Sequence, residues 1–434
     1  MEEVVLKYGQ GQVTIPVDGA ASLDYLYETP MAEIPDLKAA FLKSVTTDVI
    51  GSAPLCELVT PQDPITIVIS DMTRFWMRQD LVCEQLVRYL HETLGIPFEN
   101  LVVLVAVGTH RGHSQEELAK LSSQYVFDHV KVVDHSADAP DLVAIGTTSL
   151  GTVVEVNPLA IGRKVICVGG TVHHIMAGYG GGRKSIVPGI ASRETIKQNH
   201  QRALDPSAPQ SDPTVGSGKL GKNPIHEDMY EAGALAQVTF GINIVVTSSG
   251  KHSGLFSGDF DKAWRKSCHY VQTSYGLPIA KEADIVIASC GGFPKDLNLY
   301  QSTKSMFNAT QAVKKGGTLI WLAQCPEGSG ASDFFAWNKP LQEGHLDESL
   351  RKDFTIGGYI FYAAVENIAK ANTLLLSDID PQEVKAMGIT AYDDITALLS
   401  QVDFAGKSVY VLPYGGSVMP QLQEKYDALC AEFV

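Results

Sequence analysis

Short runs of apolar, largely β-branched residues alternate with segments of helical periodicity along most of the chain. Runs of this length and composition are typical of strands that are covered on both faces of a sheet. They form two series: Ile65–Ser70, Leu101–Val107, Val130–Val133 and Val165–Val168, followed by Ile285–Ser289, Thr318–Ala323, Thr373–Leu376 and Ser408–Leu412. The alternation predicts an α/β fold with largely parallel sheets.

The two series predict two α/β domains, and 434 residues are enough for two large cores. We place the boundary before the helical segment that leads to Ala283, which gives domains of residues 1–272 and 273–434. We expect the second domain to be Rossmann-like and the active site to lie in the cleft between the domains. The other expected elements are a hairpin over residues 4–17 and helices at Leu81–Leu94, Ser192–Leu204 and Gln301–Lys315.

The charge balance argues against one class of partner. Asp and Glu number 49 and Lys and Arg number 34, so the net charge is −15 and general nucleic-acid binding is not expected. No apolar run approaches the roughly 18 residues of a membrane helix, and Met-Glu-Glu is unlike the start of a signal peptide. The seven cysteines contain no CxxC pair. We therefore expect a cytoplasmic protein with reduced thiols that does not enter a membrane.

The densest chemical signal is the segment 169–190, which follows the expected strand Val165–Val168. Four of the five residues 178–182 are glycine, and Arg183 and Lys184 come next. Ligands of α/β sheets bind beyond the carboxyl ends of strands, and glycines let the backbone approach them closely. The segment lacks the GxxxxGK[ST] pattern of a P-loop. It predicts an anion-binding loop of another kind, with a flexible turn and a solvated Arg-Lys pair as the alternative.

Several histidines lie near expected strand ends. His110 follows the strand Leu101–Val107, and His174 leads directly into the glycine loop, so both are candidates for proton transfer. We interpret His113 and His173 as structural residues. His200 lies on the expected helix that Ser192 caps, where a single histidine is more often structural than a ligand.

Two further groups favour anion binding. Arg74 follows the strand Ile65–Ser70, and its guanidinium suits a carboxylate or phosphate, with an ordinary surface ion pair as the alternative. Gln301 and Lys304 share one helix face. Lys304 near a helix start opposes the macrodipole, which indicates an anionic partner unless the lysine is simply solvated.

Taken together, these segments resemble the nickel-dependent lactate racemase family, called LarA. The resemblance covers most of the chain and spans both expected domains. Its motifs are Asp71-x-Thr73-Arg74, Gly108-Thr-His110-Arg111, Gly169-Gly-x-x-His173-His174-x-Met-Ala-Gly-Tyr-Gly-Gly-Gly-Arg-Lys184, His200 and Tyr300-Gln301-x-x-Lys304. Phe75-Trp76 and the segment 356–361 depart from the family pattern. The expected substrate is therefore a 2-hydroxy acid, of which lactate is one candidate.

The resemblance implies a nickel-pincer nucleotide, which is a pyridinium-3-thioamide-5-thiocarboxylate mononucleotide carrying Ni. It further implies that Lys184 forms the thioamide link, that His200 is a nickel ligand and that cofactor-maturation enzymes are partners. The other implied contacts are with the cofactor, from Asp71, Thr73, Arg74, Gly180, Gly181 and Gly182, and with the substrate, from Arg74, Tyr300, Gln301 and Lys304.

The reaction that the resemblance implies is racemisation or epimerisation of a 2-hydroxy acid by proton-coupled hydride transfer, with His110 and His174 as the two bases. A second hypothesis keeps the site but not the cofactor: His110, His113, His174 and His200 bind zinc or iron for hydrolysis or elimination. A third hypothesis is a non-enzymatic two-domain protein that closes on a small anion.

Overall fold

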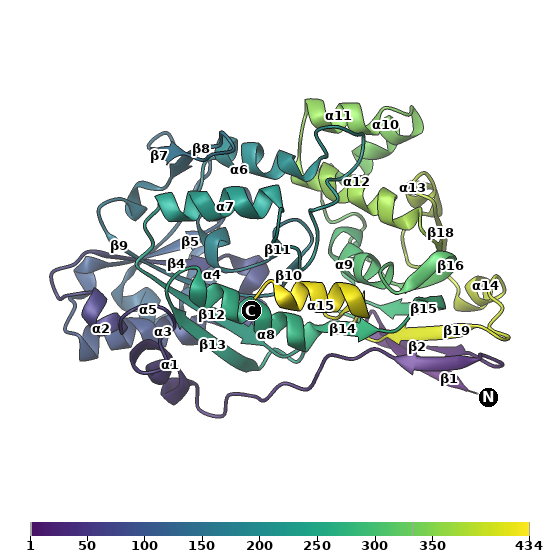
Figure 1. Ribbon diagram of the computed structural model, residues 1–434, viewed down its shortest axis with the longest axis horizontal. Coiled ribbons are helices and arrows are strands. Elements are labelled where there is room, and N and C mark those ends of the chain that lie inside the picture. The colour runs from purple at the N-terminus through teal and green to yellow at the C-terminus, as the bar shows by residue number, and fades with distance from the viewer. Residues whose placement is uncertain (1, 332, 434) are drawn as a thin grey trace. The chain divides into compact units, whose positions relative to one another are not determined.

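The computed structural model describes residues 2–331 and 333–433, which divide into two compact units (Figure 1). The loop unit, named for the glycine loop that it contains, comprises residues 31–203, 212–272 and 432–433. The carboxy-terminal unit comprises residues 2–30, 204–211, 273–331 and 333–431.

The loop unit is built on a six-stranded sheet that is parallel except at one edge. In spatial order its strands are β13 (His252–Gly258), β12 (Phe240–Val246), β9 (Lys164–Gly170), β4 (Ile65–Ser70), β5 (Leu101–Ala106) and β6 (Lys131–Asp134). The edge strand β13 pairs antiparallel with β12. All four strands of the first predicted series are therefore present and adjacent. The loops that follow their carboxyl ends leave the sheet at the same side.

Helices α1 (Leu37–Thr46), α2 (Leu55–Leu58), α3 (Gln79–Arg88), α4 (Gln115–Ser122) and α5 (Gln124–His129) share one buried core with the sheet. Ile65, Ile67 and Ile69 of β4 point into this core, because alternate residues of a strand share a face. Among the other elements of this unit, η1 (Met72–Met77), β10 (His173–His174), η5 (Gly182–Ser185) and α6 (Arg193–His200) carry predicted site residues. The rest are the π-helical turn η2 (Tyr89–Thr93), η3 (Phe98–Asn100), β7 (Val143–Thr147), β8 (Val153–Val156), η4 (Pro158–Ala160), β11 (Gly178–Tyr179), η6 (Gln201–Ala203), α7 (Pro224–Leu235) and α8 (Lys262–Tyr275), whose last three residues belong to the other unit.

The carboxy-terminal unit has a second six-stranded sheet, in which every pair is parallel. Its spatial order is β18 (Ile389–Tyr392), β17 (Asn372–Leu376), β16 (Val313–Leu322), β15 (Ala283–Ser289), β19 (Ser408–Leu412) and β3 (Ser22–Tyr25). The strand order reverses beside β15, since β16 and β19 flank it. In doubly wound sheets this reversal marks the place where ligands bind.

The hairpin β1 (Glu3–Tyr8) and β2 (Gly11–Pro16) packs on one face of this sheet through Val4, Leu6 and Ile15. Helix α9 (Leu299–Ala309) follows β15. The other elements of the unit are β14 (Gly276–Ile279), which pairs with β20 (Met419–Leu422), together with η7 (Phe334–Trp337), α10 (Asn338–Gln342), α11 (Leu346–Lys352), α12 (Ile356–Ile368), α13 (Pro381–Lys385), α14 (Ile395–Leu399) and α15 (Gln423–Ala431).

The structural units differ from a simple division into residues 1–272 and 273–434. Residues up to Pro30 belong with the carboxy-terminal unit, because β3 pairs in parallel with β19 and the first hairpin joins that unit's core. The segment 204–211 belongs there too, and the amide of Ser211 donates to Glu366 at 2.8 Å. Pairing between residues hundreds of positions apart leaves no local pattern, so the sequence did not indicate it.

Several predicted elements also change in detail. The hairpin over residues 4–17 is confirmed. The helix predicted at Gln301–Lys315 ends at Ala309, because β16 begins at Val313. The helix predicted at Ser192–Leu204 ends as α6 at His200, although Ser192 caps it as expected. All seven cysteines are free, and Cys56 is exposed. In the described part of the chain, no helix is long and apolar enough to cross a membrane.

Candidate active site

The loops after β4, β5 and β9 carry most of the predicted site residues, all within the loop unit. Asp71, Thr73 and Arg74 follow β4, His110 follows β5, and the hairpin β10–β11 and helix η5 follow β9. These strands are neighbours in the order β9, β4, β5, so sequence segments about 40 to 100 positions apart meet at one sheet edge.

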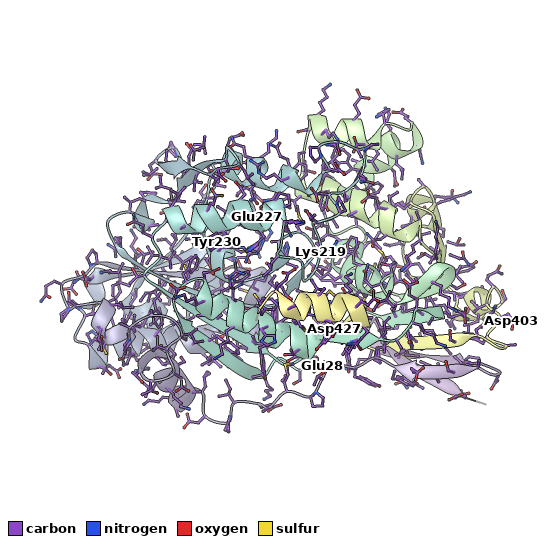
Figure 2. All side chains as sticks on the ribbon, in the orientation of Figure 1. Glu28, Lys219, Glu227, Tyr230, Asp403 and Asp427 are labelled. Carbon is purple, nitrogen blue, oxygen red and sulfur yellow. The ribbon has the colours of Figure 1, made fainter. Side chains whose placement is uncertain are left out.

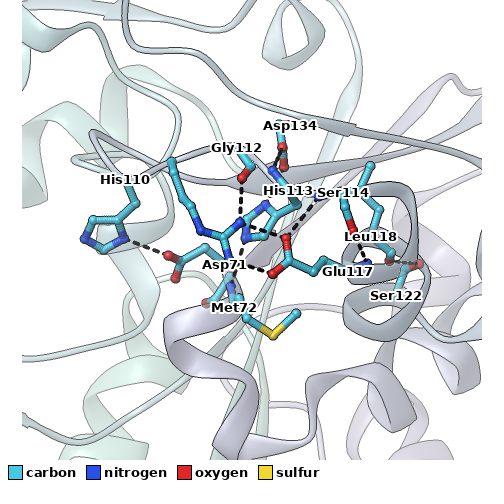
Figure 3. A network of polar contacts seen from close by, with 12 residues as sticks. Asp71, Met72, His110, Gly112, His113, Ser114, Glu117, Leu118, Ser122 and Asp134 are labelled. Carbon is cyan, nitrogen blue, oxygen red and sulfur yellow. Dashed lines mark hydrogen bonds and ion pairs between the residues drawn. The ribbon is translucent and has the colours of Figure 1, made fainter. Parts of the chain in front are cut away.

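Asp71 and His110 form an imidazole–carboxylate pair (Figure 3). His110 Nδ1 lies 2.6 Å from Asp71 Oδ2, and Thr73 Oγ1 donates to Asp71 Oδ1 at 2.7 Å. Burial alone would raise the pKa of Asp71, but the hydrogen bonds and charges of His110, Thr73 and Arg74 lower it below its ordinary value. The carboxylate is therefore ionised at neutral pH and accepts the Nδ1–H of His110. This leaves Nε2 as the basic atom of a half-exposed imidazole.

His113 is held by both of its ring nitrogens and is a structural residue, as predicted (Figure 3). Its Nδ1 lies 2.8 Å from Asp134 Oδ1 at the end of β6, and its Nε2 accepts the backbone N–H of Met72 at 3.2 Å. One imidazole thus links the loops after β4, β5 and β6. Because neither nitrogen is available, His113 cannot serve as a ligand in the four-histidine metal hypothesis.

His174 has the opposite tautomer to His110. The backbone N–H groups of Met176 and Ala177 each donate to His174 Nδ1 at 3.2 Å. Its neutral ring therefore carries the proton on Nε2. The neighbouring His173 faces another partner, Gln272 Oε1 at 3.1 Å, and burial lowers the pKa of His173 to about 4. His173 is thus a neutral structural residue.

Lys184 and His200 are two nitrogen bases whose charged forms are disfavoured. Burial, followed by the positive charges of Arg74 and Arg183, lowers the pKa of Lys184 to about 7. Burial and the charge of Lys184 lower the pKa of His200 to about 3. His200 Nδ1 donates to the carbonyl of Ile196 at 3.0 Å, which leaves Nε2 with its lone pair.

Arg74 lies in the same electrostatic environment. Its guanidinium donates to Thr73 Oγ1 at 3.0 Å and acts on the charges of both Asp71 and Lys184. Within the described residues it forms no ion pair with a carboxylate, so the alternative of an ordinary surface ion pair is not supported. A guanidinium without a carboxylate partner favours an anionic ligand.

The glycine loop is a buried structure rather than a flexible turn. Trp264 Nε1 donates to the carbonyl of Gly180 at 2.8 Å, and the guanidinium of Arg183 lies 3.8 Å over the Trp264 ring. Arg183 is only 3% exposed and donates to the carbonyl of Ala177 at 2.7 Å. Burial lowers the pKa of Arg183 to about 9. The alternative of a solvated Arg-Lys pair is therefore wrong for Arg183.

Gly181 and Gly182 are required by the protein's own packing. Both have a positive φ, +72° and +51°. A Cβ on Gly182 would lie 2.5 Å from Trp264 Cγ, and a Cβ on Gly181 would lie 3.0 Å from the carbonyl oxygen of Gly170. A Cβ on Gly180 would meet nothing closer than 3.5 Å. Close approach of a ligand is thus not needed to explain the glycines at 181 and 182.

We expect Gly182→Ala to lower the free energy of unfolding by about 3 kcal/mol, because it combines a left-handed backbone with a clash against Trp264. Gly162→Ala is the matched control, since Gly162 has φ +66° and a Cβ at that position would meet no atom within 4 Å. Gly162→Ala should lower the free energy of unfolding only by the about 1–2 kcal/mol that a left-handed backbone costs a residue with a Cβ. Urea unfolding of the two variants measures the difference, and equal losses would contradict a packing role for Gly182.

Tyr300, Gln301 and Lys304 lie in the carboxy-terminal unit, in the first two turns of α9 beyond the end of β15. Asn298 caps this helix by accepting the N–H of Gln301 at 3.0 Å. Lys304 Nζ donates to Gln301 Oε1 at 2.8 Å, and the Tyr300 ring packs edge-on against Phe334. Because these residues belong to the other unit, their part in the site and its place in a cleft stay predictions.

Sequence reasoning missed three residues that organise the site. Asp134 accepts hydrogen bonds from His113, Trp264 donates to the glycine loop, and Asp228 accepts a hydrogen bond from Asn199, the residue before His200. Asp134 directly follows an expected strand, and this position was the one available signal. Trp264 and Asp228 lie on helices far from the motifs, so nothing local marked them.

The chain is similar to lactate racemases along most of its length. A family model for the lactate racemase N-terminal domain matches residues 8–211, and one for the lactate racemase C-terminal domain matches residues 279–419. A lactate racemase from Thermoanaerobacterium thermosaccharolyticum is 36% identical over 307 residues, which are 70% of this chain and 69% of the relative. A lactate racemase from Lactiplantibacillus plantarum is 35% identical over 288 residues, 66% of each chain.

Two solved structures share the fold. The lactate racemase apoprotein from Thermoanaerobacterium thermosaccharolyticum has a TM-score of 0.81 and 28% identity, and the match covers 97% of this chain and all of that one. A protein from Thermotoga maritima has a TM-score of 0.64 and 17% identity, with coverage of 92% of this chain and 100% of that one. At that identity the second match concerns the fold alone.

Proposed function

Because this chain belongs to the lactate racemase family and is therefore an isomerase, we propose that it interconverts the stereoisomers of lactate or of a closely related 2-hydroxy acid. The observation that carries the proposal is the Asp71–His110 pair, together with the amine of Lys184, about half of which is uncharged at pH 7. The pair offers a base for a hydroxyl proton, and the amine offers a point of covalent attachment. A protein that only binds anions needs neither.

His110 is the residue that takes the hydroxyl proton of the substrate. Its Nδ1–H is bound by Asp71, so Nε2 is the basic atom, and the ionised carboxylate stabilises the imidazolium that forms. Loss of this proton allows the C2–O bond to become a carbonyl as hydride leaves C2. The imidazolium can then return its proton to the oxygen.

His174 serves the opposite face of the planar 2-oxo acid in this proposal. Its Nδ1 is occupied by two backbone N–H groups, so in the resting state Nε2–H is a donor. The resting site thus pairs one base, His110, with one donor, His174. Because the reverse reaction passes through the same transition states, the two residues exchange roles when the other stereoisomer is the substrate.

Lys184 and His200 fit a nickel-pincer nucleotide. A lysine attacks an activated acyl group as its free amine, and about half of Lys184 is uncharged at pH 7. His200 is a buried, neutral imidazole whose Nε2 keeps its lone pair, and nickel accepts imidazole together with sulfur ligands. When bound, the cofactor would supply a reversible hydride acceptor for C2 of the substrate. Its construction would require maturation enzymes as partners.

Anionic groups of the substrate and cofactor would be held by the cationic side chains. Arg74 contributes a guanidinium without a carboxylate partner in the described residues, and it donates to Thr73 Oγ1. We propose that Gly180, Gly181 and Gly182 contact the bound cofactor. We propose that Tyr300, Gln301 and Lys304 bind the substrate carboxylate from α9.

The test uses protein that is co-produced with cofactor-building enzymes and incubated with enantiopure lactate that carries deuterium at C2. We expect a racemic product that retains the deuterium, because hydride transfer never releases this atom to solvent. Loss of deuterium to water would contradict hydride transfer, and an unchanged optical rotation across a panel of 2-hydroxy acids would contradict racemase activity. Protein made without the cofactor-building enzymes is the control and should fold but not turn over.

A further inference from the structure

The buried carboxylate of Asp228 on α7 binds the helix that carries His200. Asp228 is 1% exposed, whereas its neighbours Glu227 and Tyr230 lie on the exposed face of the same helix, where Figure 2 labels them. It accepts hydrogen bonds from Thr148 Oγ1 at 2.6 Å and Thr152 Oγ1 at 2.8 Å. Buried carboxylates are costly unless they are fully hydrogen-bonded, so a carboxylate at this place calls for an explanation.

The partners of Asp228 include residues on both sides of His200 in the sequence. Asn199 Nδ2 donates to Asp228 Oδ2 at 2.8 Å, and Arg202 Nε lies 3.7 Å from the same oxygen. Arg202 Nη2 also donates to the carbonyl of Leu150 and to Thr152 Oγ1, in the turn between β7 and β8. One carboxylate therefore joins α7, the β7–β8 turn and the end of α6, which Figure 1 shows together in teal.

The contacts of Asp228 hold residues on either side of His200, whereas the imidazole is oriented by a separate hydrogen bond. The ring is fixed by its Nδ1–H bond to Ile196 O, and the chain on either side of the ring is fixed through Asn199 and Arg202 to Asp228. Among the described residues, none of the hydrogen bonds of Asp228 reaches Lys184 or the Asp71–His110 pair. Its position suits a residue that acts on the site only by way of His200.

We propose that Asp228 is a positioning residue that keeps His200 Nε2 directed at the metal of the bound cofactor. This inference rests on the proposed function, because it assigns His200 as the nickel ligand. Residues that do not bind the metal but orient one of its protein ligands typically change metal affinity by about 10- to 100-fold when they are removed. The proposal therefore concerns retention of nickel rather than attachment of the nucleotide, which occurs at Lys184.

The test compares variants of the loaded protein. After co-production with the cofactor-building enzymes, the mass of the Lys184 peptide reports attachment, and release of nickel to an excess of chelator reports retention. We expect Asp228→Ala to carry a normal Lys184 adduct but to release nickel about 10- to 100-fold faster. Asp228→Asn keeps an oxygen that can accept from Asn199 and Thr152, so it should restore most of the retention.

Asp284→Ala is the matched control, because Asp284 also accepts several hydrogen bonds, from Lys314 Nζ, Ser408 N and Ser408 Oγ, but in the other unit. It should lower the melting temperature without changing nickel release. If Asp228→Ala does not fold, Asn199→Ala removes the hydrogen bonds of Asn199 to Asp228 and to the Ile225 carbonyl and leaves the other contacts of Asp228 in place, and it should also speed nickel release.

Two results would overturn the proposal, and they distinguish its own failure from a failure of the proposed function. Wild-type rates of nickel release in Asp228→Ala, or in Asn199→Ala if the first variant does not fold, would show that the network is merely structural. A wild-type chain that carries no Lys184 adduct would instead refute the cofactor assignment, and the inference would fall with it.

Discussion

Lys184→Ala is expected to give a folded protein without a covalent adduct, without nickel and without racemase activity. Burial, followed by the charges of Arg74 and Arg183, lowers the pKa of Lys184 to about 7. At pH 7 about half of Lys184 is the free amine, whereas an ordinary exposed lysine presents about one free amine in 2,500. Intact-protein mass, nickel content and turnover measure the result.

The matched control is Lys197→Ala, since Lys197 is an exposed lysine on α6 close in the sequence to His200. It should keep its adduct and its activity. The unmodified chain offers a second measurement, in which a small acylating reagent is applied between pH 5 and 10. Because a depressed pKa places the free amine at lower pH, Lys184 labelling should level off just above pH 7. Lys184 labelling that still rises steeply between pH 9 and 10 would contradict the assignment.

His110→Asn is expected to lower kcat of the loaded enzyme by about 10²- to 10⁴-fold, the contribution typical of a general acid–base residue. For two enantiomers the equilibrium constant is one, so kcat/KM must fall equally in both directions. The variant should keep the Lys184 adduct and its nickel, because neither depends on His110. Polarimetry from each pure enantiomer measures the effect, and a fall in one direction alone would reveal a faulty assay rather than a mechanism.

Asp71→Asn tests the contribution of the Asp71 carboxylate separately from that of the His110 base. An amide accepts the Nδ1–H of His110 but does not stabilise the imidazolium, so activity should fall by less than in His110→Asn. The pKa of Asp71 is held below its ordinary value of about 4, so the carboxylate stays ionised above pH 5 and protonation of Asp71 should leave no step in the rate profile there. His129→Asn, at an exposed histidine of the same unit, is the control and should be fully active. Full activity in the His110→Asn variant would refute the role of His110 as the base.

Local patterns predicted eight strands of the two six-stranded sheets and the segments that carry chemistry, but they did not predict β3, β12, β13 or β18. Strands of the loop unit such as β4 and β5 begin at the predicted residues because a buried parallel strand needs a continuous run of apolar, β-branched side chains. The hairpin at residues 4–17 follows from glycines between two alternating runs. Residues such as Asp71 and His110 were predicted to follow strand ends, and they meet at one sheet edge because parallel strands end on the same side.

The partners of these residues could not be predicted in the same way. His113 could have been a metal ligand by its spacing, and only the fold shows that Asp134 and the backbone of Met72 occupy its two nitrogens. Gly182 was interpreted as an approach site for a ligand, yet Trp264, which is 82 positions later in the chain, is the group that excludes a side chain there.

The sequence by itself determined the alternation of strands and helices, the glycine loop and the order of the motifs, because each of these depends on neighbours within about 20 positions. Only the tertiary structure decided that residues 2–30 join the carboxy-terminal unit, that Lys184 loses its charge near neutral pH and that Asp228 binds Asn199 beside His200. Desolvation and long-range hydrogen bonds depend on which distant segments are packed together, and no local pattern in the chain records that packing.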